Sequence, residues 1–363
     1  MSLFKDMLRS GETLFRDTVV LDFDFQPKIL KYRENCQMRF ATAIRPLLQG
    51  HNGRNLFIYG APGVGKTTAC KHVLRELEEV QTGEVPSINE TKEVVPIYVN
   101  CWKENTTFKV FYSICEDLGY KFIQNKKTSE LLSLIKQKLN KISAVFIFDE
   151  IDKLDDTDFL YSVLEDIYRK SIFLITNYRD SYSELDERIR SRLGPEFLHF
   201  PAYNEFEIGG ILKQRRDYAF VDGCWNEDAF KEIIEKCTET GDVRIGLYLM
   251  REAGNIAEER SSRKITETHV AEAIKKVDDF HIKPKEGLDE DLQLILDLVK
   301  DHSGEKIGEI YNAYTKMGGE LSYKSFQRRV AKLKEGRFVF TEKISGKEGN
   351  STVLNYPKKL TDF

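Results

Sequence analysis

The 363-residue sequence contains no long hydrophobic run. No apolar stretch approaches the roughly 20 residues that a helix needs to cross a bilayer, and the N-terminus lacks the apolar core of a signal peptide. A hydrophobic fraction of 41% and a charged fraction of 31% are typical of well-folded globular domains. We therefore expect a cytoplasmic protein of two or three domains that does not enter a membrane.

Cysteine is also scarce. The six cysteines form no C-x-x-C pair and have no histidine at ligand spacing, so buried free thiols are expected rather than a zinc site or a disulfide scaffold. The formal net charge of −4 argues against a protein that coats nucleic acid along its whole surface, but it permits a local basic patch. Internal repeats and low-complexity tracts are absent from the sequence.

A glycine-rich loop follows a short apolar run in residues 55–68, which read NLFIYGAPGVGKTT. The fixed positions of the pattern G-x-x-x-x-G-K-[ST] are all filled, by Gly60, Gly65, Lys66 and Thr67. A predicted strand before the loop and a helix after it complete the context of this phosphate-binding motif. Glycines allow backbone N–H groups to turn inward around phosphate oxygens, and the helix N-terminus adds its positive end. An ordinary βα turn is the alternative.

The loop predicts a site for ATP or ADP with Mg²⁺. Lys66 would reach the β- and γ-phosphates, and the Thr67 hydroxyl would ligate Mg²⁺. The residues expected to contact the nucleotide here are Gly60, Ala61, Pro62, Gly63, Val64, Gly65, Lys66, Thr67 and Thr68.

Polar residues follow two further buried runs. Residues 145–152 read VFIFDEID, and the carboxyl ends of parallel strands face the ligand crevice. We therefore expect Asp149 to hold the Mg²⁺ shell and Glu150 to polarise the attacking water. The run 171–176 ends at Asn177, whose amide could bond the γ-phosphate or the water. A plain acidic turn and a plain asparagine turn are the structural alternatives.

Arginines at two places suggest a role in catalysis. Residues 186–194 read DERIRSRLG, and Arg188 and Arg192 lie four residues apart on one face of a short predicted helix. They could act on a neighbouring subunit's nucleotide as arginine fingers, or they could form a solvated face. Residues 241–244 read GDVR and open another helix, which would place Arg244 where its guanidinium can reach a bound nucleotide.

Strands alternate with helices up to about residue 203, and the strands are almost continuously apolar. This pattern favours an α/β fold with a mostly parallel sheet covered on both faces. We predict a nucleotide-binding α/β domain with an N-terminal segment at 1–203, an all-helical domain at 204–280 and a third domain at 281–363, after a linker near 279–287. A surface loop is expected at 78–93.

The third domain is predicted to be a winged helix-turn-helix. Helices are expected at 288–303, 306–317 and 323–335, and strands at 338–343 and 352–356 around a turn at 345–350. One face of the third helix carries Tyr323, Phe326, Val330 and Leu333, and the opposite face is basic. This arrangement is typical of a helix that reads the major groove of DNA. The residues expected to bind DNA are Lys324, Ser325, Arg328, Lys332, Lys343 and Lys347.

The charge distribution supports that prediction. Residues 322–347 hold eight Lys or Arg and two Glu, whereas residues 288–320 are acidic. A solvated amphipathic helix in a protein-binding winged helix is the alternative.

These motifs resemble those of the AAA+ ATPases and, within that class, of the archaeal origin-recognition and helicase-loading initiator family, which is related to eukaryotic origin-recognition subunits. The phosphate loop and the acid pair are typical of the whole ATPase class. Segments 14–27, 193–204 and 241–258, together with the last domain, carry the similarity to initiators, which covers nearly the whole chain. The resemblance implies an AAA+ domain, a helical lid at 204–277 and a winged helix.

The resemblance also implies roles for individual residues. Asn177 would be sensor 1 and Arg244 sensor 2, while Arg192 would be the arginine finger and Arg188 a second contact, although spacing does not separate these two. Pro27, Ile29 and Tyr203 would border the adenine. Relatives carry a DNA-touching helix pair near 103–127, which makes Lys109 a DNA-binding candidate, but helices that cover a core carry lysines too. Relatives often have a wing richer in arginine, so Lys343 and Lys347 predict a weaker wing contact.

By this resemblance the chain would be an ATP-dependent replication initiator. It would bind double-stranded origin DNA, help recruit or load the MCM helicase, act with other initiator paralogues, associate with the nucleoid and hydrolyse ATP slowly as a switch. An ATP-regulated transcription factor with the same winged helix is the main alternative. A clamp-loader-like motor is a third, which has no obvious place for a DNA-reading winged helix.

Overall fold

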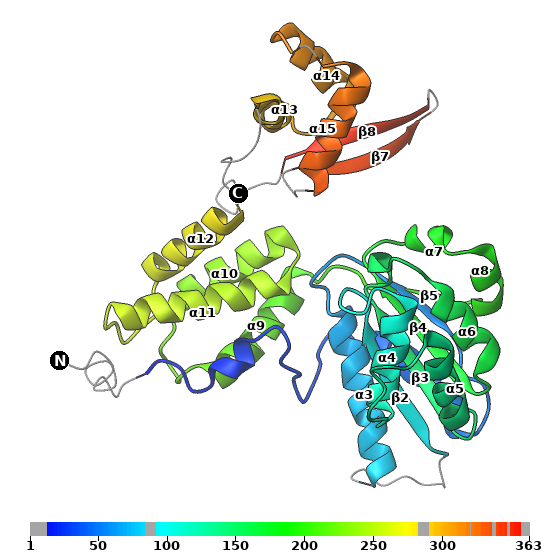
Figure 1. The fold of residues 1–363 in the computed structure, drawn as a ribbon. Coiled ribbons are helices and arrows are strands. Elements are labelled where there is room, and N and C mark those ends of the chain that lie inside the picture. The colour runs from blue at the N-terminus through cyan, green and yellow to red at the C-terminus, as the bar shows by residue number, and fades with distance from the viewer. Residues whose placement is uncertain are drawn as a thin grey trace.

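The computed structural model of the protein describes residues 13–83, 92–281, 290–319, 321–335, 339–346 and 349–356. Its central sheet has five strands in the order β2-β3-β4-β1-β5 (Figure 1). The strands are β1 (Leu56–Tyr59), β2 (Val94–Asn100), β3 (Ser143–Asp149), β4 (Lys170–Thr176) and β5 (Glu196–His199). All neighbouring strands run parallel, which confirms the predicted α/β fold.

Helices cover both faces of this sheet. They are α2 (Glu34–Leu48), α3 (Lys66–Thr82), α4 (Thr107–Asp117), α5 (Thr128–Leu139), α6 (Asp158–Asp166), α7 (Ser181–Glu184) and α8 (Glu187–Leu193). Alternate residues of a strand point to opposite faces. In β3, Val145 and Ile147 share a core with α2 and α3, whereas Phe146 and Phe148 share a core with α4, α5 and α6. All of β3 is buried, as expected for a central strand of a parallel sheet.

The helical lid is a second body of packed helices, drawn beside the sheet in Figure 1. Its helices are α9 (Glu205–Ala219), α10 (Glu227–Thr240), α11 (Val243–Glu259) and α12 (Glu267–His281). The N-terminal segment joins this body, because Phe15, Val20 and Leu21 are buried in the core of the lid. The apolar side chains of this segment thus pack on the lid and not, as predicted, with the α/β domain.

The last domain is a winged helix, as predicted. Its elements are α13 (Glu290–Asp301), β6 (Glu305–Lys306), α14 (Ile307–Lys316), α15 (Tyr323–Glu335), β7 (Phe340–Gly346) and β8 (Gly349–Asn355). The strands form an antiparallel sheet in the order β6-β8-β7. Strand β6 was not predicted, because a strand of two residues leaves no alternating pattern. Phe326, Val330 and Leu333 anchor α15 in the core of this domain.

Three predicted boundaries were wrong. Helix α3 continues to Thr82, where a loop was expected from residue 78, because the Gln81 amide exchanges hydrogen bonds of 2.9 and 2.7 Å with the backbone of Val94 and so fixes the last turn against β2. Helix α12 continues to His281, inside the expected linker. The wing strands pair through residues 345, 346, 349 and 350, where a turn was expected.

Two expectations about composition can be compared with the structure. All six cysteines are buried and free. Among the helices in the described ranges, none combines the length and the apolar character that crossing a bilayer requires.

Candidate nucleotide-binding site

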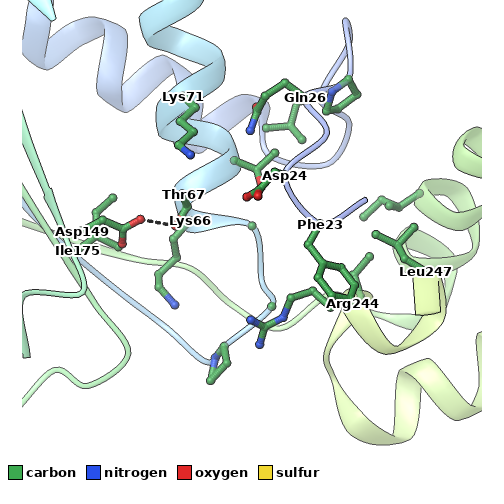
Figure 2. A pocket seen from close by; sticks show the side chains of 18 of the residues that line it. Phe23, Asp24, Gln26, Lys66, Thr67, Lys71, Asp149, Ile175, Arg244 and Leu247 are labelled. Carbon is green, nitrogen blue, oxygen red and sulfur yellow. Dashed lines mark hydrogen bonds between the residues drawn. The ribbon is translucent and has the colours of Figure 1, made fainter. Parts of the chain in front are cut away.

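A cavity lies where the carboxyl ends of β3 and β4 meet the phosphate loop and the lid (Figure 2). Its volume is about 320 Å³, within the range of about 300–1,000 Å³ that is typical of small-molecule sites. The walls come from the N-terminal segment, the phosphate loop with α3, the ends of three strands, and lid helices α9 and α11. The site therefore depends on both the sheet and the lid.

Two glycines of the loop are fixed by close neighbours. Gly63 and Gly65 have φ angles of 75° and 86°, a conformation that favours glycine. A Cβ on Gly63 would lie 2.0 Å from Asp242 Oδ1, and a Cβ on Gly65 would lie 2.7 Å from the Tyr203 hydroxyl. The loop can therefore close against the lid only where it carries no side chain.

The Lys66 ammonium is held inside the loop. Its Nζ donates hydrogen bonds to the carbonyls of Gly60 at 2.7 Å and Ala61 at 2.9 Å, and to Asn177 Oδ1 at 2.9 Å. Burial lowers the pKa of Lys66 to about 8, although the carboxylate of Asp149 opposes this shift. The predicted phosphate lysine and the predicted sensor asparagine thus meet at one end of the cavity.

Both oxygens of the Asp149 carboxylate accept hydrogen bonds. Its Oδ2 accepts hydrogen bonds from the Thr67 hydroxyl at 2.6 Å, drawn as a dashed line in Figure 2, and from the Tyr98 hydroxyl at 2.8 Å. Its Oδ1 accepts the backbone N–H of Glu150 at 2.9 Å. These oxygens suit Mg²⁺, which proteins usually hold through one or two side-chain oxygens together with phosphate. No group of three or more His, Cys, Asp or Glu suited to a metal occurs among the described residues.

Glu150 occupies an unusual backbone position. Its φ of 57° lies in the left-handed region, which is uncommon for a residue with a long side chain and often marks a functional turn. The carboxylate lines the cavity. Burial, followed by the charges of Asp149 and Asp152, raises the pKa of Glu150 above its ordinary value. A carboxylate with this tuning is suited to polarise a water molecule.

Two of the three residues predicted to border the adenine line the cavity. Pro27 and Tyr203 line it, but Ile29 does not, and Leu30 lies there instead. Ile29 is 65% exposed, and its carbonyl accepts a hydrogen bond from the Gln214 amide on α9 at 3.3 Å. The prediction that Ile29 borders the cavity was therefore wrong. Pro27 and Leu30 face the cavity, and the chain turns outward between them.

Some loop residues contribute without lining the cavity. Gly60 and Ala61 supply the carbonyls that hold Lys66, and Val64 is fully buried in the core beneath the loop. The residues of the predicted set that line the cavity are Pro62, Gly63, Gly65, Lys66, Thr67 and Thr68.

Comparisons with known proteins place this fold and site in a family. The model of the AAA domain matches residues 49–178, and the model of the Cdc6 AAA+ ATPase-type lid domain matches residues 210–275. The ORC1-type DNA replication protein 2 of Methanothermobacter thermautotrophicus is 30% identical, over 96% of this chain and 94% of that relative. The chain belongs to the ORC1-type DNA replication proteins.

Two further proteins support the membership. The ORC1-type DNA replication protein 1 of Sulfurisphaera tokodaii is 30% identical, over 89% of this chain and 84% of that protein. The solved structure of the Aeropyrum pernix ORC1 protein in complex with DNA superimposes with a TM-score of 0.69 at 26% identity, covering 94% of this chain and 93% of that chain. The ORC1-type fold thus extends over nearly the whole chain.

In this ORC1-type chain, Arg244 reaches the cavity from the start of α11. Figure 2 shows its guanidinium directed toward Lys66. Its Nε donates to both carboxylate oxygens of Asp242, at 2.9 and 3.0 Å, and its Nη2 donates to Oδ2 at 2.5 Å. Asp242 Oδ1 also accepts the backbone N–H of Arg244 and so caps the helix. Arg244, the predicted lid arginine, is therefore oriented by Asp242 of the same GDVR segment.

The candidate finger arginines lie apart from the cavity, on α8. Arg188 bonds Asp186 with two distances of 3.1 Å, and Arg192 forms an ion pair with Glu165. The guanidinium carbons of both lie near the Tyr161 ring, 5.8 and 5.1 Å from its centroid. Neither residue lines this chain's own cavity, so the prediction that they act on a neighbouring nucleotide still stands, and so does the choice between them.

The predicted DNA-binding side chains of α15 face solvent. Lys324, Arg328 and Lys332 are exposed on the side opposite the buried residues of that helix, and Ser325 is half-buried. Lys109 is exposed on α4, where its Nζ donates to Asn105 Oδ1 at 2.9 Å. The Lys343 side chain and all of Lys347 lie outside the described residues. For the whole set, DNA binding stays a prediction.

Arg33 and Tyr98 are among the residues of the site that the sequence did not predict. Arg33 is only 4% exposed, and its guanidinium lies 3.6 Å from the centre of the Tyr203 ring. It donates to the carbonyls of Val64 at 3.1 Å and Pro201 at 2.7 Å, which ties the phosphate loop to the start of the lid. Tyr98 binds Asp149. Both act across long sequence separations, and no local motif marks them.

Proposed function

We propose that this chain is an ATP-dependent replication initiator that binds origin duplex DNA and helps recruit or load the replicative MCM helicase. The main support is that two features occur together in this ORC1-type chain. A cavity that joins Lys66, Asp149 and Arg244 occurs in the same chain as a winged helix whose third helix exposes a basic face. A nucleotide-controlled DNA-binding protein needs both parts.

Each part of the cavity has a separate task in this proposal. The phosphate loop and Lys66 hold the β- and γ-phosphates, while Pro27 and Tyr203 enclose the adenine. Thr67 and Asp149 would hold Mg²⁺, which supplies positive charge to the phosphates. Glu150 polarises the attacking water and Asn177 orients it. Arg244 carries the state of the nucleotide into the lid, because it belongs to α11.

Slow turnover fits the position of the arginines on α8. Neither Arg188 nor Arg192 lines the cavity of its own chain, so full stabilisation of the transition state would need a second subunit. Another copy or an initiator paralogue would supply it. An isolated chain should then hydrolyse ATP slowly and behave as a switch, since a finger arginine commonly contributes about 10³–10⁵ in rate.

DNA binding would use the winged helix together with the ATPase domain. Arg328 is proposed to read a base edge, and Lys324 and Lys332 to contact phosphates. Lys109, on α4, would add a contact from the ATPase domain. The Aeropyrum pernix relative was solved in complex with DNA.

The test compares a duplex from a candidate origin with a shuffled duplex of the same length. The full-length protein should prefer the origin duplex in a gel-shift titration at fixed salt. Lys66→Ala should lose ATP binding, because Lys66 holds the phosphates, and the duplex binding that remains should no longer respond to ATP. Equal affinity for both duplexes, or unchanged ATP affinity of Lys66→Ala, would refute the proposal.

A further inference from the structure

The Tyr98 hydroxyl is the one contact of the Asp149 carboxylate that no motif accounts for. Tyr98 lies in β2 and pairs with Ile147 of β3, two residues before Asp149. Side chains two residues apart in a strand share a face. Tyr98 packs against the core that contains α3, and the first turns of that helix carry Thr67. Three elements therefore converge on one carboxylate.

Two hydroxyls from different elements bond the same oxygen. Thr67 Oγ1 lies 2.6 Å and Tyr98 Oη lies 2.8 Å from Asp149 Oδ2, while Oδ1 accepts the Glu150 N–H. A carboxylate with donors on both oxygens has one preferred orientation. Thr67 belongs to the first turn of α3, next to the phosphate loop, whereas Tyr98 belongs to the sheet. Tyr98 thus holds Asp149 from the side of the sheet.

The Tyr98 ring is itself restrained. The Lys71 ammonium lies 4.6 Å from the ring centroid, a favourable cation–π distance. Lys71 follows Thr67 by one turn of α3, so the two side chains share a helix face. Lys71 and Tyr98 both line the cavity. The Lys71 contact and the packing of Tyr98 on the core therefore hold the hydroxyl toward Asp149.

We propose that Tyr98 is a positioning residue for the magnesium site, acting through the orientation of Asp149. This inference rests on the proposed nucleotide function. A phenol hydroxyl that donates to a carboxylate leaves the other lone pairs of that carboxylate available to a metal or to its water shell. Tyr98 fixes where those lone pairs point and does not itself touch the nucleotide phosphates.

The test uses Tyr98→Phe, which removes one oxygen atom and keeps the ring. Affinity for a fluorescent ATP analogue is titrated first in EDTA and then at increasing MgCl₂. In EDTA, the affinity of the variant should match that of the wild type. The half-saturating Mg²⁺ concentration should rise about tenfold, the lower end of the effect of losing a group that hydrogen-bonds a metal ligand. Thermal unfolding of the variant establishes that it is folded.

Tyr120→Phe is the matched control. Its hydroxyl donates to the Leu134 carbonyl at 3.2 Å, away from the cavity, so its Mg²⁺ dependence should stay that of the wild type. An unchanged Mg²⁺ dependence in Tyr98→Phe overturns the inference. So does an equal loss of affinity in EDTA and in Mg²⁺, which would indicate a purely structural role. A wild-type protein that binds no nucleotide would instead refute the proposed function.

Discussion

The Lys66 ammonium is enclosed by its own loop, and this sets a pH dependence for nucleotide binding. Burial lowers its pKa from 10.5 to about 8. Above that pH the free site holds Lys66 increasingly neutral, whereas bound phosphate favours the charged form. Binding should therefore take up a proton above about pH 8, and affinity should fall as the pH rises.

Calorimetry in two buffers of different ionisation enthalpy measures that uptake directly. Near pH 6.5 the number of protons taken up should be close to zero, and near pH 9 it should approach about one. Proton release on binding, or a nucleotide affinity that does not change across this pH range, would contradict the lowered pKa of Lys66.

Arg244 should discriminate between ATP and ADP. Its guanidinium is pre-oriented by Asp242 and directed into the cavity, so Arg244→Ala should weaken ATP binding by about 1–2 kcal/mol more than ADP binding. Competition titrations with both nucleotides give the difference. Arg260→Ala is a suitable control, because it also removes a lid arginine from an ion pair, with Glu272, outside the cavity.

An equal loss of ATP and ADP affinity in Arg244→Ala would mean that the guanidinium does not sense the γ-phosphate. The arginine would then serve only to hold the lid.

Among the elements, α15 carries the DNA prediction. Arg328→Ala should weaken duplex binding by about 1–3 kcal/mol and relax the preference at one base position, because it is expected to read a base. Lys332→Ala should weaken binding to all duplexes alike and reduce the salt slope by about 1. Gln327→Ala, an exposed and uncharged neighbour, should change neither quantity. If Arg328→Ala binds normally at low salt, the base contact lies on another element.

Elements with strong local patterns were predictable from the sequence. Helix α15 (Tyr323–Glu335) has the predicted bounds, because its apolar spacing and its cap are local signals. Boundaries failed where a distant contact decides them. Gln81 extends α3 by binding the backbone of Val94, and β6 exists only because it pairs with β8.

The same rule holds for the residues of the site: those in local motifs were predicted, and those that depend on distant contacts were not. Gly65, Lys66, Thr67 and Asp149 lie in motifs and were found directly. Arg33 and Tyr98 reach the site from other elements, and their partners are more than 30 residues away. A lone arginine before a helix, or a tyrosine in a strand, is too common to predict a role. Ile29 was misplaced by one residue, because the local turn decides which of two neighbours faces the cavity.

At the scale of the whole molecule, the N-terminal segment links the lid to the sheet. Phe15 and Leu21 are buried in the lid, whereas Pro27 borders the cavity and its carbonyl accepts a hydrogen bond from Arg75 of α3 at 3.2 Å. The cavity is therefore shared by the lid, this segment and the sheet. We propose that a change of nucleotide at the phosphate loop reaches the lid through Arg244 and through this segment.

In the proposed function, the chain acts at replication origins under nucleotide control. Mapping the DNA sites bound by the full-length protein across the genome of replicating cells, together with the positions where new strands begin, tests it most directly. We expect a few strong sites that coincide with replication start points. Binding scattered over many promoters, without enrichment at those start points, would contradict it and would favour a winged-helix transcription factor.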